Sequence, residues 1–343
     1  MRATLRLGLT CDNRCVFCAQ AGLADGAPRP ALEEELRRLR AEADELSFVG
    51  GEPTLDARLP EAVAQARAAG FARVGIQTNG RHLAALAPAL ARAGLTDVHV
   101  SIHGAEPAVH DYHSGAPGSF AALVDGIAAA RAARLTVAAT TVLTRSNMRA
   151  LSALPPLLGE LDVAAWLVEV PRAAGRAAAA FDRVMPRLAL ALPFALHALD
   201  AARRLGLAAL IRGAPLCRLG PLDGWRLADE PRSYGAACAA CPARAACPGL
   251  DPIYLERFGG DELAPRSVAA PLSVADERAR LFVGIGERAA ASAAAPPPAD
   301  DARRRLPLAG KVQPALREVS AAAPRRSGAE LRELFPDLFR REG

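Results

Sequence analysis

The sequence has few aromatic residues, a single lysine and no long hydrophobic run. Aromatic residues make up 4% of the 343 residues, and almost none stands among the scattered arginines that give the chain a net charge of +5. A nucleic-acid surface therefore has little support. The longest apolar runs are far shorter than the ~20 residues of a membrane span. Met1 leads almost directly to Cys11, which leaves no room for a secretory leader. We therefore expect a cytoplasmic protein without nucleic-acid or membrane partners.

The first 205 residues alternate between short strand-like runs and longer helical stretches, which predicts an α/β fold. Strands are predicted at residues 3–9, 45–49, 72–77, 97–102, 135–142 and 162–169. Helices are predicted near residues 31–43, 58–70, 81–93, 119–133, 146–159 and 185–205. Six successive βα units indicate a parallel sheet with the helices outside it, a partial (β/α)6 relative of the TIM barrel. Its active site should lie at the carboxyl ends of the strands.

The remaining chain is predicted to be less regular. Residues 206–262 are loop-rich and rich in proline, glycine and cysteine, so we expect a small domain that a metal group organises. Residues 263–290 are predicted to form a helical extension. Residues 291–343 should be a linker and a C-terminal tail with a short amphipathic helix at 328–341.

The cysteines fall into two groups. The first group is Cys11, Cys15 and Cys18, and the second is Cys217, Cys238, Cys241 and Cys247. An odd number of cysteines in a cytosolic chain argues against a set of disulfides and suggests two metal centres. Three thiolates on one loop would hold a 4Fe–4S cluster with one iron left open. The alternative is a structural zinc loop that takes a fourth ligand from elsewhere.

Residues at the predicted strand ends make the sequence similar to the radical S-adenosylmethionine (radical SAM) superfamily. The three cysteines fit the C-x3-C-x-φ-C motif, with Phe17 at its aromatic position. Gly50, Gly51, Glu52 and Pro53 follow the second predicted strand, where that family has its GGEP motif. The resemblance implies a radical SAM barrel that binds a 4Fe–4S cluster on the catalytic cysteines, together with S-adenosylmethionine. It also implies that the glycines approach the methionyl amino group and that the glutamate helps to hold it.

Other polar residues at strand ends are candidate cofactor contacts. They are Asn79, Ser101, His103, Arg145 and Glu169. Period-two geometry places His99, Ser101 and His103 on one face of a strand, which should point into the barrel. His99 could instead be a core histidine. Arg145 suits the methionyl carboxylate or is a surface arginine, and Glu169 could contact the adenine through its backbone alone.

The second cysteine group resembles part of a SPASM domain or of the shorter twitch domain, which carry auxiliary iron–sulfur clusters in radical SAM enzymes. The runs from His110 to Phe120 and from Pro171 to Ala177 support that branch. Ser114 departs from it, because an arginine is usual there, and a full SPASM domain has more cysteines. The resemblance implies one auxiliary 4Fe–4S cluster ligated by four cysteines. A zinc ribbon on the same thiolates is the alternative.

The resemblance further implies an oxidoreductase or maturase. The reduced cluster would cleave S-adenosylmethionine to a 5′-deoxyadenosyl radical, which abstracts hydrogen from a substrate. The auxiliary cluster could accept the remaining electron or be purely structural. We expect a peptide or amino-acid-derived substrate, and an electron donor such as flavodoxin or ferredoxin. A separate recognition protein or the C-terminal tail would replace the N-terminal recognition domain that many peptide maturases have.

Two other functions remain open. One is a radical SAM enzyme that acts on a small-molecule cofactor precursor. Its molybdopterin-type form is disfavoured, because the chain ends in Arg-Glu-Gly rather than in that family's Gly-Gly tail. The other is a non-catalytic, metal-binding interaction protein built on the same barrel.

Overall fold

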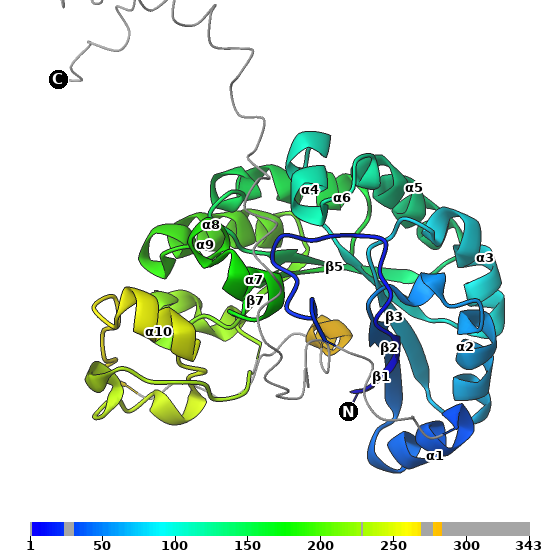
Figure 1. The fold of residues 1–343 in the computed structure, drawn as a ribbon, viewed down its shortest axis with the longest axis horizontal. Helices are drawn as coiled ribbons and strands as arrows, with labels where there is room; N and C mark the ends of the chain where they lie inside the picture. Colours follow the sequence, from blue (N-terminus) through cyan, green and yellow to red (C-terminus); the bar gives the residue numbers. More distant parts are fainter. Residues whose placement is uncertain (1, 24–30, 228, 269–276, 283–343) are drawn as a thin grey trace, which may run out of the picture. The chain divides into compact units, whose positions relative to one another are not determined.

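Seven parallel strands form one sheet in chain order (Figure 1). The computed structural model describes residues 2–23, 31–227, 229–268 and 277–282. The strands are β1 (Arg2–Gly8), β2 (Glu45–Gly50), β3 (Arg73–Thr78), β4 (Asp97–Ser101), β5 (Thr136–Val142), β6 (Ala165–Glu169) and β7 (Ala208–Arg212). Each pairs in parallel with the next. The parallel α/β fold predicted from the sequence is therefore confirmed.

The sheet continues by one strand beyond the six that were predicted. β7 lies inside the segment that we expected to be loop-rich, and its register with β6 runs from Ala165↔Ala208 to Glu169↔Arg212. All five of its residues are buried. The run Ala-Ala-Leu-Ile-Arg is short and contains one β-branched residue, so propensity alone gives little strand signal. Burial against β6 decides its conformation.

Helices surround the outside of the curved sheet in Figure 1. The α-helices of the described residues are α1 (Leu32–Glu42), α2 (Leu59–Ala68), α3 (Leu83–Ala93), α4 (Pro107–Ser114), α5 (Ser119–Ala132), α6 (Leu154–Glu160), α7 (Gly175–Ala179), α8 (Phe181–Val184), α9 (Leu188–Arg204) and α10 (Pro252–Phe258). In Figure 1, α10 lies apart from the sheet. The short helices α4, α7, α8 and α10 were not predicted. The helix expected at residues 146–159 begins as the 3-10 helix η2 (Met148–Ala153) and continues as α6. Within the described ranges, no helix has the length and apolar character needed to cross a membrane.

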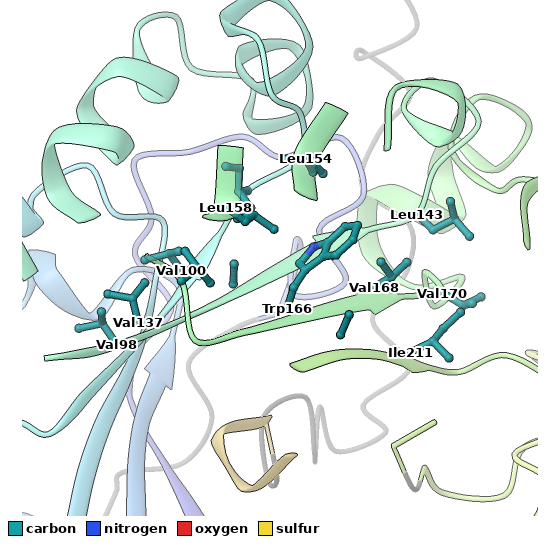
Figure 2. Close-up of a cluster of buried hydrophobic side chains, with 14 of the residues drawn as sticks. Val98, Val100, Val137, Leu143, Leu154, Leu158, Trp166, Val168, Val170 and Ile211 are labelled. Atoms are coloured by element: carbon teal, nitrogen blue, oxygen red, sulfur yellow. The ribbon is translucent and has the colours of Figure 1, made fainter. Parts of the chain in front are cut away.

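The outer face of the sheet carries large apolar side chains that pack against these helices. Figure 2 shows such a cluster around Trp166, with Val168 on the same strand and Ile211 on β7. All three side chains are fully buried, and burying a side chain of this size contributes roughly 1.5–3 kcal/mol. The indole N–H of Trp166 donates to Thr141 Oγ1 at 2.9 Å, so this polar atom keeps a partner inside the core.

The inner face of the sheet carries a buried ion pair that joins β1 to β4. Arg2 donates to Asp97 through Nη1 at 2.6 Å and through Nη2 at 3.1 Å. Gly75 lies between them on β3, where a Cβ atom would come within 2.4 Å of Asp97 Oδ1. The missing side chain thus leaves room for the pair. Burial alone would raise the pKa of Asp97, but the hydrogen bonds and charge of Arg2 outweigh it and lower that pKa.

A short segment from late in the chain covers part of the inner face. It is the 3-10 helix η7 (Glu277–Phe282), drawn in gold in Figure 1. Leu281 and Phe282 are buried in a second apolar cluster with inner-face residues of β5, β6 and β7. The ring of Phe282 meets the ring of His99 edge-on at 5.0 Å.

The expected helical extension at residues 263–290 is described only in part, and η7 is the 3-10 helix within it. The predicted linker and tail at residues 291–343, with the amphipathic helix at 328–341, lie outside the described residues.

Changing Asp97 to alanine should lower the free energy of unfolding by about 3–5 kcal/mol, because it removes the two-bond partner of the buried Arg2 guanidinium and leaves it only the pair with Glu45 at 2.9 Å. Urea unfolding at pH 7 measures this loss. Asp200→Ala is the control: it breaks the exposed 2.8 Å pair with Arg204 and should cost about 0.5 kcal/mol or less. Equal losses in both variants would contradict the role of Asp97. The stabilisation is present above the ordinary aspartate pKa of about 3.9 and disappears as the pH falls through the lower folded-state pKa.

Candidate functional site

The three N-terminal cysteines lie on one loop, residues 9–18, which follows β1 at the carboxyl end of the sheet. Cys11 is exposed, whereas Cys15 and Cys18 are half-buried. Burial raises the pKa of Cys15, and the nearby charges of Cys18 and Cys11 raise it further. Burial and nearby charges also raise the pKa of Cys11, so a cationic metal group bound here would stabilise the thiolate form of both residues. We call this segment the cysteine loop.

Two backbone hydrogen bonds attach the cysteine loop to the end of α4. The Arg14 N–H donates to the carbonyl of Ser114 at 2.8 Å, and the Val16 N–H donates to the carbonyl of His113 at 3.0 Å. These carbonyls belong to the last turn of α4, where helical carbonyls lack a partner within the helix. The loop thus completes the helix end, and the helix end fixes the loop.

α7 holds the other end of the cysteine loop. The Arg176 N–H donates to the carbonyl of Cys18 at 3.0 Å, and its Nη1 donates to the carbonyl of Cys15 at 3.3 Å. Gly175 has φ +53°, and a Cβ atom there would lie 2.4 Å from the Cys18 carbonyl oxygen. Only glycine lets α7 begin so close to the loop. The sequence analysis did not assign this role to Arg176.

Gly50, which ends β2, and Gly51, which follows it, lie against the start of the cysteine loop. The Gly51 N–H donates to the carbonyl of Gly8 at 2.9 Å, and the Glu52 N–H donates to that of Thr10 at 2.8 Å. A Cβ atom would lie 2.2 Å from the Gly8 oxygen if placed on Gly50, and 2.2 Å from the Thr10 oxygen if placed on Gly51. The immediate need for glycine here is therefore the close approach of two backbone segments.

Glu52 is buried and joins the ends of β2 and β3. Its Oε1 accepts hydrogen bonds from Thr54 N at 3.0 Å, Thr54 Oγ1 at 2.6 Å and Thr78 Oγ1 at 2.7 Å. Its Oε2 accepts one from Asn79 N at 2.6 Å. Burial raises the pKa of Glu52, although these hydrogen bonds oppose the rise. Pro53 begins the 3-10 helix η1 (Pro53–Leu55) that Glu52 caps. Oε2 retains acceptor capacity for a further donor.

Asp12 links the cysteine loop to the turn after β3. It accepts hydrogen bonds from Asn79 Nδ2 at 2.7 Å, Arg81 Nη1 at 2.6 Å and His82 Nε2 at 2.9 Å. Asn79, a predicted cofactor contact, therefore binds Asp12 through its side chain and Glu52 through its backbone. Asp12 was not among the residues predicted from the sequence. An acidic residue directly after the first cysteine was the available signal.

Three histidine rings and Phe17 form a buried aromatic cluster behind the cysteine loop. The ring of His103 lies 4.5 Å from Phe17 and stacks on His110 at 5.7 Å, while His113 lies 6.5 Å from Phe17. Burial lowers the pKa of all three histidines, that of His110 to about 4, so the rings are neutral at pH 7. His103 comes after β4 has ended at Ser101, so the strand alternation does not extend to it.

The run from His110 to Phe120 has a local structural role in addition. Asp111 accepts hydrogen bonds from Gly118 N at 2.6 Å, Phe120 N at 2.8 Å and Ser119 Oγ at 2.9 Å. These donors lie at the start of α5, where free N–H groups favour an acceptor. Ser114 lies within hydrogen-bonding distance of Ser119, with Oγ atoms 2.6 Å apart. The spacing of this run therefore serves the α4–α5 connection.

Two predicted cofactor contacts have other partners. Arg145 is exposed, and its Nη1 donates to the carbonyl of Asp182. Glu169 ends β6 and forms an ion pair with Arg212 at the end of β7, with Oε1 and Nη2 separated by 3.1 Å. Ser101 is half-buried at the end of β4. His99 is buried among the inner-face residues near Phe282, as the core-histidine alternative requires.

The four C-terminal cysteines line one pocket. They are Cys217, Cys238, Cys241 and Cys247. The thiol of Cys247 accepts backbone hydrogen bonds from Leu216 N and Gly249 N, each at 3.4 Å. Burial raises the pKa of the Cys217 thiol. Four sulfur donors around an apolar pocket, with N–H groups directed at one of them, form a suitable donor set for an iron–sulfur cluster.

The spacing of the donors bears on the zinc alternatives. A tetrahedral zinc site with Zn–S bonds of about 2.3 Å places its sulfurs roughly 3.8 Å apart. In the described parts of the chain, no three His, Cys, Asp or Glu side chains converge closely enough to hold one metal ion.

Residues 5–151 match the family model described as Radical SAM superfamily. This part of the chain is therefore similar to radical SAM domains. The match extends from β1 into η2, so it includes the cysteine loop and the Glu52 turn. Among the described residues outside it, β6 and β7 continue the same sheet.

Several curated relatives share part of this domain. A probable GTP 3′,8-cyclase of Thermococcus kodakarensis is 35% identical over 130 residues, 36% of this chain and 42% of the relative. A GTP 3′,8-cyclase of Stenotrophomonas maltophilia is 42% identical over 107 residues, 29% of this chain and 33% of the relative. Molybdenum cofactor biosynthesis protein 1 of Bos taurus is 33% identical over 32% of this chain and 19% of that protein. The chain thus spans less than half the length of these relatives.

Solved structures show a similar fold. Streptococcus suis SuiB bound to precursor peptide SuiA has a TM-score of 0.49 and 17% identity, covering 62% of this chain and 49% of SuiB. Native anSMEcpe with bound AdoMet has a TM-score of 0.41 and 20% identity, covering 49% of this chain and 51% of that one.

Changing Gly51 to alanine should displace the cysteine loop, because the added Cβ overlaps the Thr10 carbonyl. We expect a loss of about 1–3 kcal/mol in unfolding free energy and reduced iron uptake, measured by urea unfolding and by iron analysis after anaerobic reconstitution. Gly8→Ala is the matched control, because a Cβ on Gly8 has nothing within 4 Å. Iron uptake that is unchanged in Gly51→Ala would show that the close approach is unnecessary.

Proposed function

We propose that the chain is a radical SAM enzyme that cleaves S-adenosylmethionine and abstracts a hydrogen atom from a small-molecule cofactor precursor. The observation that carries the proposal is the three-cysteine loop, fastened to the Glu52 turn, α4 and α7 inside the radical SAM domain. A non-catalytic metal-binding protein would not need the free acceptor of the Glu52 turn beside a loop that supplies three cysteine ligands.

The donor set fits a 4Fe–4S cluster held by Cys11, Cys15 and Cys18. When bound, such a cluster supplies an open iron for S-adenosylmethionine and the electron that cleaves its sulfonium bond. Three cysteines provide three of the four ligands, so one position stays open. The aromatic cluster behind the loop consists of neutral rings, so it places no positive charge next to the cluster site.

The chain's own residues would bind and orient the cofactor. Glu52 has a free acceptor position on Oε2, which suits the methionyl ammonium group. Because the same carboxylate is fixed by Thr54, Thr78 and Asn79, the acceptor is held in place before the cofactor arrives. Orientation of this kind is what lets a reactive radical meet one hydrogen atom and not others.

The relatives favour a small-molecule substrate over the peptide or amino-acid derivative that we first expected. Proteins named GTP 3′,8-cyclase and molybdenum cofactor biosynthesis protein 1 share the domain at 33–42% identity. Their names describe a nucleotide cyclisation and a cofactor pathway. We therefore propose a nucleotide or similar precursor as substrate and a cyclisation-type reaction, in place of a maturase acting on peptides.

We further propose one auxiliary 4Fe–4S cluster on the four C-terminal cysteines, as in the SPASM and twitch branch. Four thiolates complete the coordination of a cluster and leave no iron for a substrate. The auxiliary site would then act in electron transfer or in holding the segment together, and the substrate would bind beside the first cluster. A flavodoxin or ferredoxin would supply the electron.

The full chain, reconstituted anaerobically, should bind about eight irons and form 5′-deoxyadenosine from S-adenosylmethionine. Formation should rise when GTP is added, and mass spectrometry should find an altered nucleotide. A peptide panel should have no such effect. Stimulation by peptides alone would contradict the small-molecule substrate. Zinc binding without 5′-deoxyadenosine would contradict the enzyme.

Substitutions should separate the two cysteine groups. Cys15→Ala should abolish 5′-deoxyadenosine formation, whereas the exposed Ser152→Ala on η2 should leave it unchanged. Cys241→Ala should lower the iron content from about eight to about four per chain and keep cofactor cleavage. Product formation that disappears in Cys241→Ala points to electron transfer, and an unfolded segment points to a scaffold. Full iron content in Cys241→Ala would exclude the auxiliary cluster.

A further inference from the structure

The carboxylate of Asp12 receives three side-chain hydrogen bonds from a single turn. The donors are Asn79 Nδ2, Arg81 Nη1 and His82 Nε2, at 2.7, 2.6 and 2.9 Å. All three belong to the turn between β3 and α3. Arg81 Nη1 also donates to the backbone carbonyl of Asp12 at 3.1 Å. The Asp12 and Arg81 side chains are 23% and 27% exposed, so water screens this pair less than a surface pair.

The remaining attachments of the cysteine loop are made by its backbone. Gly8 and Thr10 accept bonds from the glycine turn, and Arg14 and Val16 donate to α4. Between Thr10 and Arg14, every hydrogen bond that the structure assigns between the loop and another element goes to the β3–α3 turn. The bond from Arg81 to Asn13 Oδ1 is long, at 3.5 Å, whereas those to the Asp12 carboxylate are 2.6–2.9 Å. Asp12 is therefore the main side chain that holds the part of the loop next to Cys11.

Asn79 extends this connection to the glutamate turn. Its side-chain Nδ2 donates to Asp12 Oδ1, and its backbone N–H donates to Glu52 Oε2 at 2.6 Å. One residue thus sets the distance between the loop that carries Cys11 and the carboxylate proposed to bind the cofactor. A loop that shifted on its own would have to break one of these bonds.

We infer that Asp12 is a positioning residue, which holds the Cys11 end of the loop so that the first cluster binds and keeps its iron. This inference rests on the proposed function, because it assumes that the loop holds a cluster. Asp12 ligates nothing itself. It acts through Cys11 on one side and through Asn79 and Glu52 on the other, as partners behind metal ligands commonly do.

The test compares three forms of the full chain: unchanged, Asp12→Ala and Asp56→Ala. Asp56 is the matched control, because it also pairs with an arginine, Arg58, at 2.7 Å, but lies outside the loop. After anaerobic reconstitution, Asp12→Ala should release half of its iron to a chelator about 10–100-fold faster, while the other half stays bound at the auxiliary site. The KM for S-adenosylmethionine should rise more than the turnover number falls. Asp56→Ala should match the unchanged chain.

Hydrogen exchange on the iron-free chain keeps the test independent of catalysis. Amides of residues 11–13 should exchange faster in Asp12→Ala, whereas amides of α5 should not change. Arg81→Met removes one of the three side-chain donors to Asp12 together with the bond to its backbone carbonyl, and should produce both effects to a smaller extent. Asp12→Asn, which keeps one acceptor oxygen, should also lie between Asp12→Ala and the unchanged chain.

Three outcomes are distinct. Iron release and exchange in Asp12→Ala equal to those of the unchanged chain would overturn the inference. If the unchanged chain binds no cluster, the proposed function fails. Faster exchange confined to residues 11–13 would then still support the holding role of Asp12.

Discussion

The arrangement of the loops at the carboxyl end of the sheet depends on one buried carboxylate, that of Glu52. A buried charge is costly unless hydrogen bonds satisfy it, and here four donors from Thr54, Thr78 and Asn79 do so. Those donors come from the ends of two neighbouring strands. Because loss of any one leaves the others around a poorly satisfied charge, the turn keeps one geometry, and the cysteine loop is built against it.

The parallel sheet brings these pieces together. Its strands run in one direction, so the loops after β1, β2 and β3 meet at one edge, although 70 residues separate Asp12 from His82. The opposite part of the barrel interior is filled differently, by the Arg2–Asp97 pair and by η7. Buried charges and apolar contacts therefore fill the inner face of the sheet, and the polar residues and the cysteine loop lie at the carboxyl ends of the strands.

The two cysteine groups differ in what they leave open. Three donors on the first loop provide an incomplete set, which suits a reactive cluster, and four donors around the second pocket provide a complete one. The surroundings agree with this difference. The first loop is fastened to four separate elements, whereas the sulfur of Cys247 receives N–H groups from its own segment.

Local pattern in the sequence was enough to predict six strands, the parallel fold, both cysteine groups and the Gly50–Glu52 turn, because strand period and motif spacing are properties of neighbouring residues. Contacts between distant residues required the tertiary structure. Arg145, for which the sequence left open a cofactor contact or a surface arginine, is exposed and donates to the carbonyl of Asp182. β7 was missed because burial, not propensity, makes it a strand. The sequence determined which donors exist. The packing of the strand ends decided which of them meet, since Asp12 becomes a partner of Asn79 only when parallel strands align their carboxyl ends.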